Sequence, residues 1–348
     1  AILHAGYGEH GIHVVDLDKG RVVSQVTLPQ VFYGLCFDPT GGSVFASGAE
    51  SEVVYQFEFA DGFLSKPREL KVGAAKEELI PTGLSCSRDG KTLYAALGWG
   101  QAISLLPIAA PEQAVRIALP AGSHPYTTLP ALSGTRLYVS LWGGAAVAVV
   151  DTNTQRVEAT WPVDSHPTEM ALSPDGETLY VACANSNHVV VLDTESGKQL
   201  EVISSALYPR SPNGSTPNSL SLSKDGQLLV VANADNNNLA LFNVAERGEA
   251  KALGYIPVGW YPTSVRFGRN GDLHVTNGKG LLPKANRQGS TTVRDEVARP
   301  LREYIAGIFR GTLGSLKVPT PEQMSAYTKQ AYECSPLKAD QSVVGNSR

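Results

Sequence analysis

Short apolar runs alternate with turn residues along most of the chain, and residues 166–198 show the pattern clearly. Within that segment, 179–184 (LYVACA) and 189–193 (VVVLD) are rich in the β-branched and aromatic residues that favour strands. Asp175-Gly176 lies where a hairpin would turn, and a glycine there accepts a positive φ. Similar glycines recur about every 42 to 50 residues, close to the ~40–45 residues of a four-stranded propeller blade, at positions 41, 90, 134, 176, 226 and 271. The pattern predicts an all-β protein, a β-propeller.

The strand pattern also predicts the number of blades. One unit has its four strands, from the axis outward, at 168–173, 178–184, 188–193 and 199–204. Five complete units begin near Phe32, Pro81, Pro125, Pro167 and Pro217. The N-terminal part supplies only the outer three strands of a blade, so the first blade lacks its own innermost strand. A seven-bladed propeller fits if 304–309 and 314–319 complete the last blade after 263–268 and 272–277; six blades are the alternative and would leave a surplus strand.

The end of the chain departs from the repeat. Residues 278–303 interrupt the last blade with a polar insertion containing Lys279, Lys284, Arg287 and Arg294. We expect this insertion to fold over the loop face beside Trp260 and partly cover the axial opening, because a loop this long in a compact repeat is functional or disordered. Thr320, followed by a proline and then by a glutamine at the third helical position, predicts a capped helix over 321–332. The predicted domains are a propeller over 1–319 and a C-terminal helix with a linker-like tail over 320–348.

Two stretches resemble known families. The runs SPDGETLYVACANSNHVVVLDTESGK (173–198) and SKDGQLLVVANADNNNLALFN (223–243) resemble the YVTN-type propeller repeats of bacterial and archaeal surface or periplasmic proteins, and this similarity covers about 30–280. Residues 277–290 and 304–337 resemble the closing part of bacterial fusion proteins, in which such a propeller precedes an alkaline-phosphatase-like phosphoesterase domain. The resemblance implies a periplasmic or extracellular location and a phosphoesterase domain as partner. The phosphoesterase half has no matching positions in this sequence, so none of its metal ligands carries over.

Composition narrows the classes of partner. The net charge of −4 gives the chain as a whole no electrostatic reason to bind nucleic acid. No run of about 18 apolar residues exists that would predict a membrane span. Four scattered cysteines do not suggest a disulfide framework. Cys36 and Cys86 fall on the innermost strands of neighbouring blades but one residue out of register, and we expect free thiols that face opposite ways.

One predicted face carries two kinds of loop: those that join the outermost strand of one blade to the innermost strand of the next, and those between the second and third strands of a blade. Unusual side chains concentrate on this loop face. Aromatic rings and imidazoles there combine an apolar body with a polar tip, as a ligand site would. Structural packing is the alternative reading, since proline stiffens each strand entry. The candidate ligand- or partner-binding residues of this loop face are Tyr33, Trp99, His124, Tyr126, Trp142, His166, Asn185, His188, Asn218, Asn236, Trp260 and Tyr261.

Three functions remain open. The first is a non-catalytic module that recognises a small-molecule or anionic ligand, or docks a partner, on the loop face. The second is a metal-dependent propeller hydrolase at the axial mouth, prompted by His124, His166 and the amide-rich loops. Zinc sites recruit three or four protein ligands, and no catalytic motif appears, so we predict no catalytic residues, no metal and no cofactor. The third is a surface-layer or adhesive module.

Overall fold

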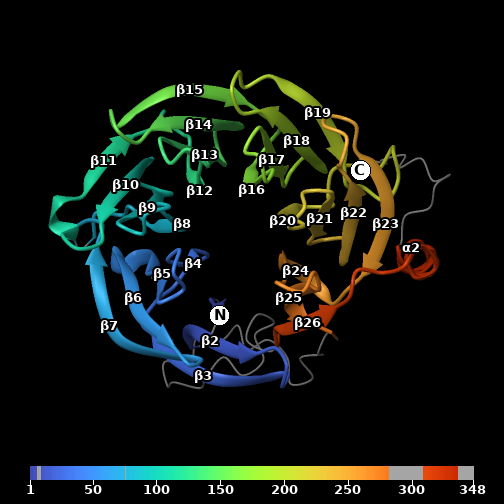
Figure 1. The fold of residues 1–348 in the computed structure, drawn as a ribbon, viewed down its shortest axis with the longest axis horizontal. Helices are drawn as coiled ribbons and strands as arrows, with labels where there is room; N and C mark the ends of the chain where they lie inside the picture. The colour runs from blue at the N-terminus through green and yellow to red at the C-terminus, as the bar shows by residue number, and fades with distance from the viewer. Residues whose placement is uncertain (6–8, 75, 282–308, 336–348) are drawn as a thin grey trace, which may run out of the picture. The chain divides into compact units, whose positions relative to one another are not determined.

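Seven sheets make up the fold, and the protein is a seven-bladed β-propeller (Figure 1). The computed structural model describes residues 1–5, 9–74, 76–281 and 309–335. Within these residues the sheet orders are β1-β2-β3, β4-β5-β6-β7, β8-β9-β10-β11, β12-β13-β14-β15, β16-β17-β18-β19, β20-β21-β22-β23 and β24-β25-β26. We refer to them as blades 1 to 7. The predicted all-β, seven-bladed class is confirmed, and the six-bladed alternative is wrong.

The first of two compact units holds the described residues up to Glu177. Blade 1 has only three described strands, as the pattern predicted. The strands of this unit are β1 Ile2–His4, β2 His10–Asp16, β3 Arg21–Leu28, β4 Leu35–Phe37, β5 Ser43–Ser47, β6 Val53–Ala60, β7 Phe63–Lys71, β8 Pro81–Cys86, β9 Thr92–Leu97, β10 Ala102–Pro107, β11 Val115–Ala118, β12 Pro125–Pro130, β13 Arg136–Leu141, β14 Ala146–Asp151, β15 Arg156–Pro162 and β16 Pro167–Leu172, with 3₁₀ turns at Ala49–Ser51 and Pro111–Gln113.

The second unit holds the described residues from Thr178 to Leu281 and from Arg310 to Ser335. Its single described helix follows the last strand. Its elements are β17 Thr178–Cys183, β18 His188–Asp193, β19 Gln199–Ser204, β20 Pro217–Leu222, β21 Leu228–Asn233, β22 Asn238–Asn243, β23 Lys251–Pro257, β24 Trp260–Phe267, β25 Leu273–Gly280, β26 Thr312–Leu316 and α2 Pro321–Cys334.

Burial explains why the two middle strands are mainly apolar in blades 3 to 6. Every residue of β14 except its last is buried, whereas the outer strand β15 alternates between exposed and covered positions. A blade packs against a neighbour on each side, so its middle strands meet apolar surface on both faces. Ile103 from blade 3 and Leu141 and Val150 from blade 4 share one such core between blades. The repeat therefore encodes the contacts between blades as well as each sheet.

The Asp-Gly turns close the hairpins at the face opposite the loop face. Gly90 has a φ of 70°, which costs glycine little and other residues more. The Ser87 hydroxyl donates to the Asp89 carboxylate and also accepts the Thr92 N–H, at 2.9 Å. These local bonds fix the turn between β8 and β9, so the repeated glycines are structural, as the sequence indicated.

The last blade corrects one strand assignment. Residues 314–319 were expected to form its outermost strand, but β26 (Thr312–Leu316) pairs directly with β25, with Leu273 opposite Leu316. Within the described residues this blade has three strands. The insertion also begins later than predicted, because β25 continues to Gly280. Residues 282–308 lie outside the described part of the chain, and with them most of 304–309 and of the proposed cover over the loop face.

The C-terminal helix α2 begins where the sequence predicted and extends to Cys334. The Gln323 N–H donates to the Thr320 hydroxyl at 3.3 Å, and the Gln323 side chain accepts the Thr320 N–H at 3.0 Å. This reciprocal cap satisfies two N–H groups that a helix start would otherwise leave unpaired. Met324 buries itself in the apolar core that blades 6 and 7 share, which attaches the helix to the second unit.

The two cysteines of the innermost strands do not point away from each other. Cys36 on β4 and Cys86 on β8 pack against the same apolar cluster, and the neighbouring Cys86 thiol raises the pKa of Cys36. The expectation failed because side chains of opposite orientation on neighbouring blades converge on the interface that the blades share. Both thiols are free, as predicted.

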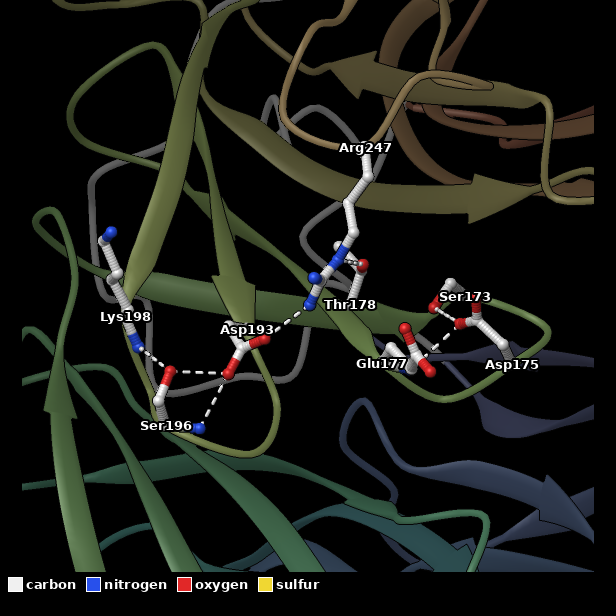
Figure 2. A network of polar contacts seen from close by, with 8 residues as sticks. All are labelled: Ser173, Asp175, Glu177, Thr178, Asp193, Ser196, Lys198 and Arg247. Carbon is white, nitrogen blue, oxygen red and sulfur yellow. Dashed lines mark hydrogen bonds and ion pairs between the residues drawn. The ribbon is translucent and has the colours of Figure 1, made fainter.

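In the second unit, an ion pair on the face opposite the loop face joins the loop after β22 to the turn after β18. Figure 2 shows Arg247 reaching the Asp193 carboxylate, at 2.5 Å, and the Thr178 hydroxyl, at 3.0 Å. The same carboxylate accepts the Ser196 N–H at 2.7 Å and the Ser196 hydroxyl. The Ser196 hydrogen bonds first, and Arg247 after them, hold the pKa of Asp193 well below its ordinary range. The charged form of Asp193 therefore stabilises the fold.

Replacing Asp193 with asparagine is expected to lower the free energy of unfolding by about 1–2 kcal/mol near neutral pH, a value discounted because the pair is partly exposed. A depressed native pKa stabilises fully above the unfolded-state pKa of about 4 and loses that effect as the pH falls through the native pKa. Urea titrations at about pH 7 and about pH 3 should show the deficit shrinking in acid. Glu195→Gln, in the same turn, is the control. An equal deficit at both pH values would contradict this assignment.

Candidate functional site

The loop face is built from two kinds of loop that strand alternation brings to the same edge. In blade 4, the Trp142 N–H between β13 and β14 donates to the His124 carbonyl just before β12, at 3.1 Å. In blade 3, the Gly98 N–H donates to the Ile80 carbonyl at 3.0 Å. Backbone hydrogen bonds therefore join the loops of this face and hold the residues whose side chains they present.

The residue before each proline at the start of an innermost strand has left-handed backbone geometry. Tyr33, which precedes a glycine instead, occupies the equivalent position. An ordinary side chain pays about 1–2 kcal/mol for this conformation, and such strain concentrates at functional sites. Four of the candidate residues occupy these positions. The positive φ angles are Tyr33 60°, Ile80 52°, His124 43°, His166 57°, Thr216 53° and Tyr261 59°.

In the first unit, the loop face gathers six of the predicted site residues into close pairs or beside them. The rings of Tyr33 and Tyr126 lie 4.3 Å apart between centroids, and those of Trp142 and His166 lie 4.0 Å apart. Trp99 exposes 68% of its surface and Trp142 exposes 41%. Exposed indoles on hydrogen-bonded loops form a surface ready to bury apolar area against a partner. These contacts bring predicted binding residues of blades 2 to 5 near one another.

His124 and His166, the two histidines that prompted the metal-dependent alternative, have different hydrogen-bond partners. His124 Nδ1 lies 3.1 Å from the Gly98 carbonyl oxygen, and since a carbonyl only accepts, Nδ1 carries the hydrogen. His166 Nδ1 lies 2.9 Å from the Ser165 hydroxyl. Within the residues that the structure describes, no group of three or more His, Cys, Asp or Glu side chains could hold a metal ion. The hydrogen bonds orient both imidazoles, and His166 also contacts the Trp142 ring.

In the second unit the predicted residues are more scattered. Trp260 exposes 43% of its surface, and the Lys279 ammonium lies 4.2 Å from the centre of the Tyr261 ring, a cation–π contact. Asn236 donates to the Ser215 hydroxyl at 2.8 Å. Asn185 is exposed, whereas His188 and Asn218 are half-buried. Asn236 thus holds its loop to Ser215, and the most exposed ring here is that of Trp260.

A set of loop residues that the sequence analysis missed holds these loops in place. Each lies just before the third strand of a blade, has positive φ and uses a side-chain oxygen to accept a backbone N–H from the loop that leaves the same blade. Glu52 accepts from Leu79 at 2.8 Å, and Asn237 accepts from Tyr261 at 2.8 Å. Gln101 accepts from Gly122, and Asn187 from Gly214 and Ser215. We call this arrangement the loop clasp; the repeated acceptor residue before strand three was its sequence signal.

Glu52 differs from the other clasp residues because its acceptor is a carboxyl group. The residue is 2% exposed. Burial raises the pKa of this carboxyl, and the hydrogen bond from the Leu79 N–H partly offsets that effect. Blade 4 has Ala145 at the same position, also with positive φ, and alanine offers no side-chain acceptor. The clasp is thus formed in blades 2, 3, 5 and 6.

Comparison with known proteins supports the fold. A family model described as "Lactonase, 7-bladed beta-propeller" matches residues 144–267. No curated protein sequence matches the chain. Similar solved structures include hydrazine synthase of Kuenenia stuttgartiensis, with a TM-score of 0.60, 18% identity and coverage of 77% of this chain and 86% of that one. Virginiamycin B lyase from Staphylococcus aureus has a TM-score of 0.57, 18% identity and coverage of 70% and 76%. A streptogramin B lyase has a TM-score of 0.60, 16% identity and coverage of 85% and 86%.

These comparisons bear on architecture. At identities of 14–18%, the likeness to the lyases and to hydrazine synthase is a likeness of fold. Among the described residues, no helix is long and apolar enough to cross a membrane. The chain is therefore a propeller of a class that other proteins use for quite different activities, and its function must be argued from its own loop face.

Proposed function

We propose that this protein is a non-catalytic binding module whose loop face docks a partner, and that the partner is a phosphoesterase domain of the type that follows YVTN-like propellers in bacterial fusion proteins. The proposal includes a periplasmic or extracellular location. The partner and the location rest on the sequence resemblance. The docking surface rests on the geometry of the first unit.

One observation carries the docking surface: Trp99 and Trp142 are exposed although their loops are fixed. The Trp99 N–H donates to the Leu79 carbonyl at 3.1 Å, and the Trp142 N–H donates to that of His124 at the same distance. A fixed, exposed indole loses little conformational freedom on binding, which is why tryptophan is common among residues that dominate binding energy. The two exposed indoles therefore suit a role in binding a partner.

The binding test removes both indoles. Titration of a separately produced phosphoesterase domain of the fusion type, followed by calorimetry, should give measurable binding to the unmodified chain. In a Trp99→Ala, Trp142→Ala double variant, the Kd should rise by at least roughly 30-fold, the effect of losing a single anchor worth about 2 kcal/mol.

The matched control is Phe63→Ala. Phe63 is a large exposed apolar residue of the same unit, 58% exposed, but it follows the turn between β6 and β7 on the opposite face. Its removal should leave the Kd unchanged. Equal weakening by the control and the double variant, or no binding by the unmodified chain, would overturn the docking proposal.

A lactone hydrolase is the second candidate, favoured by the family match over 144–267 and by the hydroxyl–imidazole pair of Ser165 and His166 within it. The unmodified chain should be assayed on simple lactones and on generic phosphoesters with added calcium, zinc or magnesium, alongside elemental analysis. Turnover that survives repurification and disappears in His166→Ala would favour an enzyme. Absence of turnover, together with the predicted loss of binding in the tryptophan variant, supports the binding module.

A further inference from the structure

The innermost strands of blades 2 and 3 lie close together. Some Cα pairs between β4 and β8 lie within 8 Å. Gly34, just before β4, lies so near β8 that a Cβ added to it would sit 2.8 Å from the Leu84 side chain and nearer still to the Thr82 carbonyl oxygen. Only a residue without a side chain permits this contact. The close approach brings the side chains that follow on both strands into one narrow interface.

Two cysteines lie in that interface, one from each strand. Cys36 and Cys86 pack on an apolar cluster that includes Phe45 of blade 2 and Leu93 of blade 3. Both thiols are free, and the strands that carry them lie side by side. Each residue is partly exposed, unlike the fully buried Cys183, although the surroundings of the Cys36 thiol are apolar. Two free cysteines on adjacent, closely packed strands are what a dithiol site requires first.

We propose that Cys36 and Cys86 form a redox modification site that closes to a disulfide between blades 2 and 3. The oxidant is a low-molecular-weight disulfide. The Cys86 or Cys36 thiolate attacks one sulfur of that oxidant, forming a mixed disulfide and releasing one thiol. The thiolate of the second cysteine then attacks the cysteine sulfur of this mixed disulfide, forming the S–S bond between the two cysteines and releasing the oxidant's remaining half as the second thiol. Two protein thiols are oxidised, one oxidant disulfide is reduced to two thiols, and both protons end on these leaving thiols.

The neighbourhood of the pair sets how fast this reaction proceeds. The Cys86 thiol first, and burial second, raise the pKa of Cys36 well above its ordinary value. Few thiolates are then present at neutral pH, and the thiolate is the species that attacks a disulfide. Oxidation should be slow, and once formed, the bond should be held by the tight packing around it.

The consequence of closure is a covalent link across an interface that otherwise depends on packing. The bond would enclose the chain from residue 36 to residue 86, including three strands of blade 2. Closing a loop of this length restricts the unfolded chain. The oxidised form should therefore melt about 3–6 °C above the reduced form, and dithiothreitol should reverse the shift.

The test uses the unmodified full chain. It is incubated for hours with excess oxidised glutathione under native conditions, quenched with acid, alkylated in denaturant, digested without reductant and analysed by mass spectrometry. The expected main product joins the peptides containing Cys36 and Cys86, with a mass lower by two hydrogen atoms than their sum. Mixed disulfides with glutathione at these cysteines as the stable end product, or both cysteines recovered alkylated, would overturn the proposal.

Two variants give the control. Cys86→Ser should leave Cys36 unable to close the bond, so glutathione remains attached to it and the melting shift disappears. Cys334→Ser removes an exposed cysteine on α2 and should leave both the linked peptide and the shift intact. Retention of the reversible melting shift in Cys86→Ser would show that it has another source and would contradict the proposal.

Discussion

Replacing Asn187 with alanine should lower the free energy of unfolding by about 3–4 kcal/mol, from the loss of three hydrogen bonds at a buried site and the strain of a left-handed alanine. Asn187 is 3% exposed and has a φ of 64°. Its Nδ2 donates to the Pro212 carbonyl at 2.9 Å, and its Oδ1 accepts from Gly214 at 2.9 Å and Ser215 at 2.7 Å. The measurement is a urea unfolding curve at neutral pH.

Two further variants separate the causes. Asn187→Gly removes the same hydrogen bonds but suits the positive φ, so it should be about 1 kcal/mol less harmful than the alanine. Asn185→Ala changes an exposed asparagine in the same turn and should stay within about 0.5 kcal/mol of the unmodified protein. If Asn187→Ala were as mild as Asn185→Ala, the clasp would contribute little and the loops would owe their order to other contacts.

The loop clasp connects stability with the binding surface. The Asn237 oxygen accepts the N–H of Tyr261, one of the candidate binding residues in the second unit. Gln101 similarly holds Gly122, two residues before His124. Each clasp residue therefore fixes a loop that carries an exposed or strained side chain. A residue of this kind positions the face without touching what binds there, so its loss should weaken binding mainly through loop disorder.

The repeat made the architecture readable from the sequence. Asp-Gly turns such as that at Gly176 and strands such as 178–183 have local causes, positive φ and apolar runs, so they emerge without knowledge of tertiary contacts. The site was readable in outline for the same reason. Trp99, Trp142 and His166 each occupy a loop whose place follows from strand alternation, and the structure places Trp142 and His166 in ring contact.

What the sequence could not supply depended on side-chain direction in three dimensions. The clasp residues look like ordinary turn residues until the N–H groups they accept, some 20 to 28 residues away, come into view. The prediction for the cysteine pair was wrong because it used only the one-residue offset in register. The relative orientation of two strands in neighbouring blades decides whether their side chains meet. Strand β26 was misassigned because an apolar stretch does not reveal which strand it will pair with.

Gly83→Ala should be strongly destabilising, lowering the free energy of unfolding by about 2–4 kcal/mol through overpacking. Gly83 is buried on β8, and a Cβ built there would lie 2.5 Å from the Cα of Thr127 on β12. The obstacle is backbone, which cannot turn aside as the end of a long side chain can. Blades 3 and 4 would have to separate along their innermost strands, and the tight packing between them makes such shifts costly.

Gly42→Ala provides the matched control for this prediction. A Cβ at Gly42 meets only the Thr40 hydroxyl, at 3.3 Å, so this variant should unfold within about 0.5 kcal/mol of the unmodified protein. Both proteins can be compared by chemical denaturation, and the spectrum of the folded Gly83→Ala variant would show whether strands are retained. A Gly83→Ala protein as stable as Gly42→Ala would mean that β8 and β12 can move apart without cost. The rigidity of the loop face, whose His124 lies directly before β12, would then need another source.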